Sequence, residues 1–402
     1  MAEDPLVKII YAYEFDAADV NVQSGRPCSI LTRLERPENH VVRAFPLNRR
    51  MRYLHQWKSY YYKARGWTYR PDREPSYLKS LARQIERRVQ GLVADVLIAP
   101  GSHVVAELRT PHPKVFVADA TFANVLDFYD SFTNCAPEFV RQGHDQDRQA
   151  LANCAAAIYP SAWAAQTAIT RYGAAPAKIH VIPFGGNLVP PNEATVGTWI
   201  DQRRFDRLRI LFIGRDWYRK GGDTVLAACS ILDRGSVPLS LDLVGVERVP
   251  ATLPRYARLH GRLNKNIPEQ RRQLESLLRH AHVLFVPSRA ENYGMVFCEA
   301  AGFGVPSLAS AVGGITAAVR HGQTGFTLPA GAKPEAFADI LEELFRDRTC
   351  HQRLALASLQ DYHARLSWDA FGRQFMRVLE GILKPPAVAR TSTVLAIDAS
   401  AA

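Results

Sequence analysis

Cysteine is scarce in this sequence, with six residues among 402, and no two of them form a CxxC pair. The sequence therefore gives little support to a structural zinc site or a disulfide framework. Most of the cysteines stand inside apolar segments, so we expect buried, reduced thiols in a cytosolic protein. They are Cys28, Cys135, Cys154, Cys229, Cys298 and Cys350.

Long apolar runs are also missing. No stretch approaches the roughly 18 consecutive apolar residues of a membrane-spanning helix. The N-terminus carries Glu3 and Asp4, which a secretory signal does not favour. Apolar residues make up 47% of the chain and charged residues 22%, as in ordinary globular proteins. We expect a cytoplasmic protein, and 402 residues are enough for two domains.

Basic residues are in excess, and they are unevenly spread. The formal net charge is +11, and residues 49–88 alone hold twelve Lys or Arg against three acids. Such a segment, rich in aromatics, fits an anionic membrane surface, an acidic acceptor or nucleic acid. The alternative is a solvated helical face whose aromatic underside packs on the core; we expect no nucleic-acid partner. The interleaved aromatics are Tyr53, Trp57, Tyr60, Tyr61, Tyr62, Trp67, Tyr69 and Tyr77.

Short apolar runs that end in Gly, Pro or Asp alternate with longer helix-like segments through most of the chain. This alternation is typical of doubly wound parallel sheets, so the fold class is α/β. The predicted strands are 7–11, 94–99, 114–118, 179–183, 209–213, 239–244, 283–286 and 306–309. The predicted helices are 29–35, 83–90, 150–156, 224–232, 269–280, 294–302, 334–345 and 368–383.

The alternation is interrupted once, at residues 188–207, where two prolines and a polar run predict a linker. We therefore expect a first domain over 1–190 and a second over 205–365. The last helical segment is assigned to 366–384, and residues 385–402 are expected to form a loose tail.

Glycine and charge gather at the predicted strand ends of the second domain, where ligands of open parallel sheets bind. The strand RILFI is followed by GRDWYRKGG, residues 214–222. Glycines let the backbone approach a phosphate. Arg215 and Lys220 supply a forked donor and a point charge that suit a pyrophosphate, with a helix N-terminus behind them.

Two glutamates eight positions apart follow the strand VLFVPS. Glu291 precedes a predicted helix start near Gly294, whereas Glu299 lies inside the helix among apolar residues. A buried carboxylate is costly without partners, and the hydroxyls of a sugar and a ribose would supply them. The alternative is a buried Glu satisfied by backbone or by an Arg. A further glycine turn, Gly313-Gly314, follows the strand PSLAS.

These pieces together resemble the donor domain of the family-4 (group 1) retaining glycosyltransferases of GT-B architecture. The matching segments are FIGRDWYRKGG, PSRAENYGMVFCEAAGFGVP and GGITAAVRHGQTGF, and SAWAAQTAITRYGAAPAKIHVIPFGG resembles the end of the acceptor domain. The resemblance covers about 90–190 and 205–380. It implies two Rossmann-like domains facing a cleft, with a C-terminal helix crossing back to the first domain.

The resemblance also implies roles for individual residues. Arg215 and Lys220 would stabilise the donor pyrophosphate, while Glu291 would bind the transferred sugar and Glu299 the ribose. Thr316-Ala317 stand where the family often has Pro-Glu, so one donor contact departs from the pattern. The implied donor-binding residues are Gly25, Gly214, Arg215, Lys220, Arg262, Glu291, Asn292, Tyr293, Gly294, Met295, Val296, Glu299, Gly313 and Gly314.

The acceptor side is less fully specified. Asp119 follows the strand KVFVA, where the family often places a His or Asp, and we hypothesise that it faces the sugar and orients the acceptor. His103 is the second acceptor candidate; a lone His is also common as an ordinary core or surface residue. The catalytic set implied is Asp119, Arg215, Lys220 and Glu291.

A DxD-like element, Asp145-Gln146-Asp147, is present but lies away from the glycine turns. We interpret its acids as helix N-terminal carboxylates. Because arginine, lysine and helix dipoles would meet the donor charge, we expect neither a metal nor another cofactor.

The expected reaction moves a hexosyl group from a UDP- or GDP-linked sugar to a hydroxyl of a glycan, lipid-linked or small-molecule acceptor, with retention of configuration. An anionic membrane surface is the further expected partner, through 49–88. The alternatives are an epimerase or phosphorylase of the same architecture, and a non-catalytic glycan- or nucleic-acid-binding protein that uses 49–88.

Overall fold

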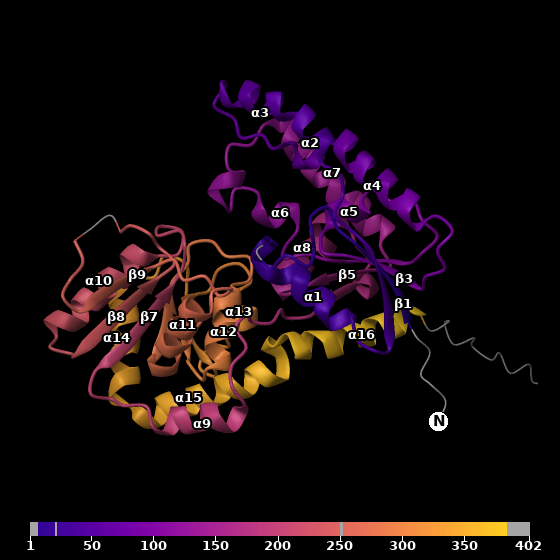
Figure 1. Ribbon diagram of the computed structural model, residues 1–402. Helices are drawn as coiled ribbons and strands as arrows, with labels where there is room; N and C mark the ends of the chain where they lie inside the picture. The colour runs from indigo at the N-terminus through magenta and orange to yellow at the C-terminus, as the bar shows by residue number, and fades with distance from the viewer. Residues whose placement is uncertain (1–6, 21, 250–251, 384–402) are drawn as a thin grey trace, which may run out of the picture.

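The chain folds into two α/β domains around two parallel sheets (Figure 1). The computed structural model describes residues 7–20, 22–249 and 252–383. Within these ranges each sheet has six strands, in the orders β2-β1-β3-β4-β5-β6 and β12-β11-β10-β7-β8-β9. The strands are β1 (Val7–Ala12), β2 (Asn39–Ala44), β3 (Val96–Ala99), β4 (Lys114–Val117), β5 (Ala156–Tyr159), β6 (Ile179–Val181), β7 (Leu208–Ile213), β8 (Leu239–Val244), β9 (Ala257–Gly261), β10 (Val283–Val286), β11 (Ser307–Ser310) and β12 (Gly325–Leu328).

Helices cover both faces of each sheet, which explains why central strands such as β10 are buried at every residue. The helices of the first domain are α1 (Arg26–Leu34), α2 (Arg50–Leu54), α3 (Gln56–Lys63), α4 (Pro75–Val89), α5 (Ser102–Val105), α6 (Phe122–Val125), α7 (Pro137–Asn153) and α8 (Ala162–Tyr172). The later helices are α9 (Glu193–Asp201), α10 (Gly222–Arg234), α11 (Pro268–His280), α12 (Met295–Gly302), α13 (Ile315–Ala318), α14 (Pro334–Arg346), α15 (Arg348–Asp361) and α16 (Trp368–Leu383).

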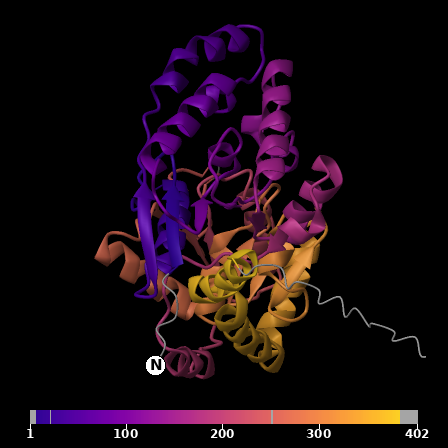
Figure 2. The same cartoon turned by 90° about the vertical axis from the view of Figure 1, so that its right-hand side faces the viewer.

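The C-terminal helix α16 returns to the first domain and packs against α1 (Figure 1). Arg33 Nε of α1 lies 3.0 Å from a carboxylate oxygen of Asp369. The Trp368 ring stacks on Phe184, with centroids 5.8 Å apart. Figure 2 shows α2 to α4, in indigo, rising at the end of the molecule opposite to α16, in yellow.

Two expected elements differ in the structure. The expected linker 188–207 contains the helix α9, whose start is capped by the Asn192 side chain accepting from Thr195 N at 2.9 Å. The expected helix over 150–156 is wrong in its second half, because α7 ends at Asn153 and β5 begins at Ala156. The tail assigned to 385–402 lies outside the described residues.

All six cysteines are free thiols, although only three of them are buried. Cys154, Cys229 and Cys298 are buried, so the expectation of burial is wrong for Cys28, Cys135 and Cys350, which are partly exposed. Among the described residues no helix combines the length and apolarity needed to cross a membrane.

Candidate functional site

In the second sheet, the direction in which successive strands are added reverses between β7 and β10. Strands β8 and β9 follow on one side of β7, and β11 and β12 continue on the far side of β10. Ligands of open parallel sheets bind at the carboxyl ends of the two strands that flank such a reversal. The loop after β7 carries Gly214 to Lys220 and the loop after β10 carries Glu291, so both predicted motifs lie at this point.

Glu291 stands between two cations of the other loop. Lys220 Nζ forms an ion pair and hydrogen bond with Glu291 Oε2. Arg219 Nη1 lies 3.6 Å from the same oxygen and also donates to Ala290 O at 2.9 Å. Arg215 is exposed and has no ion pair among the described residues. The sequence prediction therefore missed Arg219, which belongs to the same basic run and differs only in the direction of its side chain.

Glu299 is only 2% exposed, as its place inside an apolar helix predicts. Its Oε1 pairs with Lys265 Nζ and accepts a hydrogen bond from Asn187 N at 3.1 Å. Neither partner was predicted, because each is far from Glu299 in the sequence. The buried carboxylate is thus satisfied by protein groups, and a ribose would compete with the half-exposed Lys265 for it.

Gly313 and Gly314 are required by close packing of the protein on itself. A Cβ on Gly313 would collide with the carbonyl oxygen of Glu291, and one on Gly314 would collide with that of Asn292. Gly314 N donates to Glu291 O at 3.2 Å. The glycine turn therefore fixes the backbone of the Glu291 loop.

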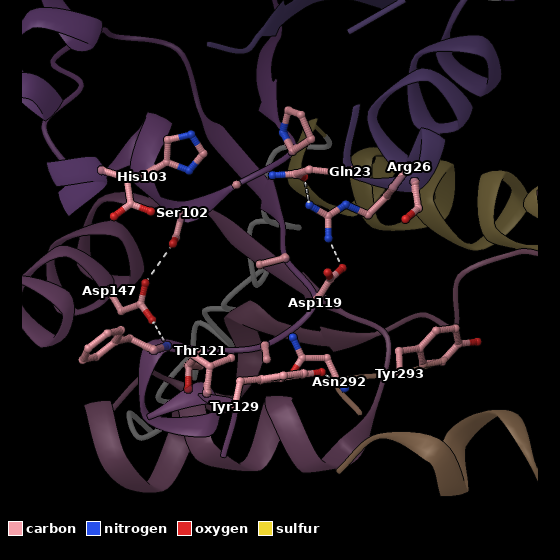
Figure 3. A pocket seen from close by; sticks show the side chains of 18 of the residues that line it. Gln23, Arg26, Ser102, His103, Asp119, Thr121, Tyr129, Asp147, Asn292 and Tyr293 are labelled. Carbon is pink, nitrogen blue, oxygen red and sulfur yellow. Dashed lines mark hydrogen bonds and ion pairs between the residues drawn. The ribbon is translucent and has the colours of Figure 1, made fainter. Parts of the chain in front are cut away.

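The start of α12 faces a cavity between the two domains. Gly294, at φ 88°, is the N-cap of α12. The Tyr293 side chain is buried and its hydroxyl donates to Phe184 O of the first domain at 2.9 Å, so only its backbone is available to a ligand. Asn292 N donates to the Tyr129 hydroxyl at 2.7 Å, which joins the domains across the cavity (Figure 3).

The cavity has a volume of about 760 Å³. Its first-domain wall includes residues that follow β1, β2, β3, β4 and β6, and the second domain contributes 291–295. Both acceptor candidates, Asp119 and His103, line it. The other predicted donor-binding residues do not line the cavity. They are Gly25, Gly214, Arg215, Lys220, Arg262, Val296, Glu299, Gly313 and Gly314.

Asp119 is held by an arginine that the sequence analysis did not identify. Arg26 Nη1 forms an ion pair with Asp119 Oδ1 (Figure 3). The Arg26 side chain is buried, which lowers its pKa, and its guanidinium lies 5.7 Å from the centroid of the Phe184 ring. Asp119 keeps 45% of its side-chain surface exposed. Arg26 therefore fixes the orientation of the Asp119 carboxylate, which remains open to the cavity.

His103 points at a buried glutamate. Its Nε2 lies 3.2 Å from Glu14 Oε1, and the Tyr77 hydroxyl donates to Glu14 Oε2. Burial raises the pKa of Glu14, but His103 and Tyr77 outweigh it, so the pKa is lowered overall. Glu14 is thus held ionised and faces His103 across the cavity wall.

Gly25 and Arg262 lie at the edges of the site. Gly25 has φ 80° and is the N-cap of α1, and a Cβ there would lie 3.3 Å from the side chain of Asn187. Arg262 follows β9 at the carboxyl edge of the second sheet and is exposed.

The DxD-like element lies inside α7, so its interpretation as helix N-terminal carboxylates is wrong. Asp147 is buried, accepts from Ser102 Oγ at 2.8 Å and also accepts from Phe122 N. Asp145 is half-exposed and pairs with Arg148 at 2.6 Å. Residues two apart on a helix face different directions, so the two carboxylates do not form a pair. Asp147 instead holds together Ser102 and Phe122, which line the cavity (Figure 3).

The comparisons with known proteins agree with this geometry. A family model described as "Glycosyl transferases group 1" matches residues 207–347, which hold β7 to β12 and both predicted donor motifs. The second domain therefore resembles the group 1 glycosyltransferases. The D-inositol 3-phosphate glycosyltransferase of Xylanimonas cellulosilytica is 32% identical over 240 residues, 56% of each chain. That of Kribbella flavida is 30% identical over 217 residues, 50% of each chain. The chain thus matches about half the length of these curated relatives.

Solved glycosyltransferase structures share the whole two-domain arrangement. Sucrose-phosphate synthase from Thermosynechococcus elongatus superposes with a TM-score of 0.65 at 16% identity, covering 94% of this chain and 99% of that one. Anabaena HepE in complex with UDP-glucose superposes with a TM-score of 0.58 at 16% identity, covering 93% and 99%. The GT-B fold predicted from the sequence is confirmed.

Proposed function

We propose that this chain is a group 1 glycosyltransferase that transfers a hexosyl group from a nucleoside diphosphate sugar to an acceptor hydroxyl, with retention of configuration. The observation that carries the proposal is the placement of Glu291. It joins Lys220 at the strand reversal of the second domain, and its loop faces Asp119 across the interdomain cavity. UDP is the first nucleotide to test because HepE was solved with UDP-glucose; GDP is the second.

In this proposal the donor pyrophosphate lies beside Lys220, Arg215 and the N-terminus of α12. Cations and backbone N–H groups placed where charge develops stabilise a leaving diphosphate. Glu291 would bind sugar hydroxyls, Glu299 the ribose, and Asp119 would orient the acceptor hydroxyl near the anomeric carbon. These cations would perform the task of a metal, so we propose that neither a metal nor another cofactor takes part. Undiminished transfer after treatment with EDTA is the expected result.

The first test is a thermal shift with UDP and with GDP. Stabilisation by one of them is expected, and no shift with either would contradict a functional donor site. A panel of nucleotide sugars then identifies the donor by nucleotide release. NMR of the product from an α-linked donor should show an α linkage, and a β linkage would contradict retention.

The surface of α2, α3 and the following loop supports a second proposal, association with an anionic membrane. The predicted alternative, an aromatic underside packed on the core, holds for the buried Tyr69 and Tyr77 and in part for Tyr62, which is partly buried and stacks on Tyr69. Trp57 and Tyr60 are 59% and 69% exposed, and the exposed Lys63 and Arg65 stand beside them. Exposed aromatics mixed with cations suit a bilayer surface with anionic lipids. Other exposed apolar side chains of this surface are Tyr53, Leu54, Tyr61 and Trp67.

Vesicle co-sedimentation tests this second proposal. Binding should rise with the fraction of anionic lipid and fall in the Trp57→Ala/Tyr60→Ala variant, while Tyr218→Ala, also exposed but on the second domain, should leave it unchanged. Binding that does not depend on anionic lipid would contradict it.

A further inference from the structure

The first-domain wall of the cavity carries more arginines than its carboxylates neutralise. Each carboxylate there already has partners. Asp119 pairs with Arg26. Asp72 pairs through Oδ2 with Arg70 at 2.7 Å, while its Oδ1 is buried without a hydrogen-bond partner among the described residues. The other two are satisfied as described above, Glu14 by His103 and Tyr77 and Asp147 by Ser102 and a backbone N–H.

Two arginines of this wall remain without such partners. The side chains of Arg52 and Arg73 form no ion pair or hydrogen bond with any residue that the structure describes, although Arg52 is near enough to Glu14 to help lower the pKa of that carboxyl. In Arg73, Nε and Nη1 are shielded from solvent and have no hydrogen-bond partner there. A buried donor without a hydrogen bond is destabilising, and more so when it is charged. A ligand that accepts from these atoms would recover that cost.

Aromatic rings hold the guanidinium of Arg73 in place. It lies 4.6 Å from the centroid of the Phe122 ring. The Arg70 guanidinium lies 4.8 Å from that of Phe132, and the two rings are in edge contact at 6.1 Å. Arg73 ends the short 3-10 turn η2 (Pro71–Arg73), which contacts α2, the helix that carries Arg52. Ring contacts therefore position Arg70 and Arg73 on this wall, and Arg52 lies on the helix beside them.

These arginines are separate from the cations assigned to the donor. Arg215 and Lys220 belong to the second domain and lie outside the lining of this cavity, whereas Arg52 and Arg73 belong to the first domain and line it. The first-domain wall can therefore bind a second anionic group, distinct from the donor pyrophosphate.

We propose that the acceptor carries an oxyanion, a phosphate above all, which binds to Arg73 and Arg52 while its hydroxyl reaches Asp119. Guanidinium groups suit phosphate because they donate two parallel, charge-assisted hydrogen bonds. The inference rests on the proposed transferase function, because it names the acceptor class of that site. The phosphate could belong to a soluble phosphorylated polyol or to a lipid headgroup.

A crossed thermal-shift experiment tests the proposal and separates it from the proposed function. Inorganic phosphate and UDP are titrated separately at constant ionic strength against the wild type, Arg73→Gln and Lys220→Ala. Arg73→Gln should lose the phosphate shift and keep the UDP shift, and Lys220→Ala should do the reverse. Arg377→Gln, an exposed arginine of α16, should keep both shifts.

Each outcome decides something. A phosphate shift that survives in Arg73→Gln, or that is missing in the wild type, overturns the anionic-acceptor proposal. A missing UDP shift in the wild type overturns the donor site instead. If phosphate binds, glycerol phosphate and phosphatidylcholine vesicles with and without phosphatidylinositol identify the source. A shift with glycerol phosphate indicates a soluble acceptor, and Arg73-dependent binding to the phosphatidylinositol vesicles indicates a lipid.

Discussion

Asn187 donates its backbone N–H to Oε1 of Glu299 at 3.1 Å, although the two residues are 112 positions apart and follow strands of different sheets. The Asn187 side chain extends the connection. It donates to Ser24 O and accepts from Trp368 Nε1 at 2.9 Å. One residue therefore connects the buried carboxylate of Glu299, the loop before Gly25 and the C-terminal helix.

Asn187→Ala should reduce both stability and donor binding. Loss of these side-chain hydrogen bonds should lower the free energy of unfolding by about 1–3 kcal/mol. UDP affinity should also fall several-fold, because the backbone N–H would no longer be held at Glu299. Asn153→Ala is the matched control, since that side chain also bonds two carbonyls, at 2.7 and 2.8 Å, but in the first domain only. Equal effects of the two variants on UDP affinity, measured by calorimetry, would contradict the connection.

Glu299→Ala should weaken UDP binding at least tenfold, because a charge-assisted hydrogen bond to the ribose is worth about 1.5–3 kcal/mol. Stability should change less, since the half-exposed Lys265 can return to water. Glu269→Ala, on the exposed side of α11, is the control and should bind UDP normally. Unchanged UDP affinity in Glu299→Ala would remove the ribose assignment.

Asp119→Asn should separate binding from transfer. The amide has nearly the same shape but no charge, so it orients the acceptor poorly and leaves Arg26 unpaired. We expect the UDP thermal shift to persist and the transfer rate to fall about a hundredfold, as for a misplaced substrate. Nucleotide release with the identified donor measures this, and wild-type turnover would show that Asp119 has no such role.

Gly314→Ala should displace the Glu291 loop. The added methyl group meets Asn292 O, and overpacking of this kind costs about 1–3 kcal/mol. Gly197→Ala is the matched control, because it lies within α9 with nothing within 4 Å of its Cβ. That variant should be stabilised by about 0.5–1 kcal/mol. Urea unfolding of both variants checks the prediction, which fails if Gly314→Ala is as stable as the wild type.

Stability should fall as the pH is lowered below about 6.5. Burial lowers the pKa of His351 to about 4 and that of His282 to about 2. Both are neutral in the folded chain, whereas the unfolded chain protonates them near pH 6.5. Their contribution is therefore fully present above about pH 6.5 and is lost as the pH falls toward the folded pKa. Between about pH 4 and pH 6.5, His351→Gln should reduce the slope of the unfolding free energy against pH by about 1.4 kcal/mol per pH unit. Denaturant unfolding over this pH range measures the slope, and an unchanged slope in the variant would contradict the prediction.

The sequence by itself determined the features that are local along the chain. Short buried strands ending in Gly, Pro or Asp indicated the α/β class, and the spacing of Lys220, Glu291 and Glu299 predicted the donor motifs. The carboxyl ends of parallel strands share one edge, so these residues could be placed near one another without coordinates.

Only the tertiary structure decided which side chains meet. It turned Arg219 rather than Arg215 toward Glu291 and brought Lys265 and Asn187 to Glu299. It also placed Arg73 in the cavity. The physical reason is that such contacts depend on side-chain direction and on the angle between two domains, and neither leaves a periodic signal in the sequence.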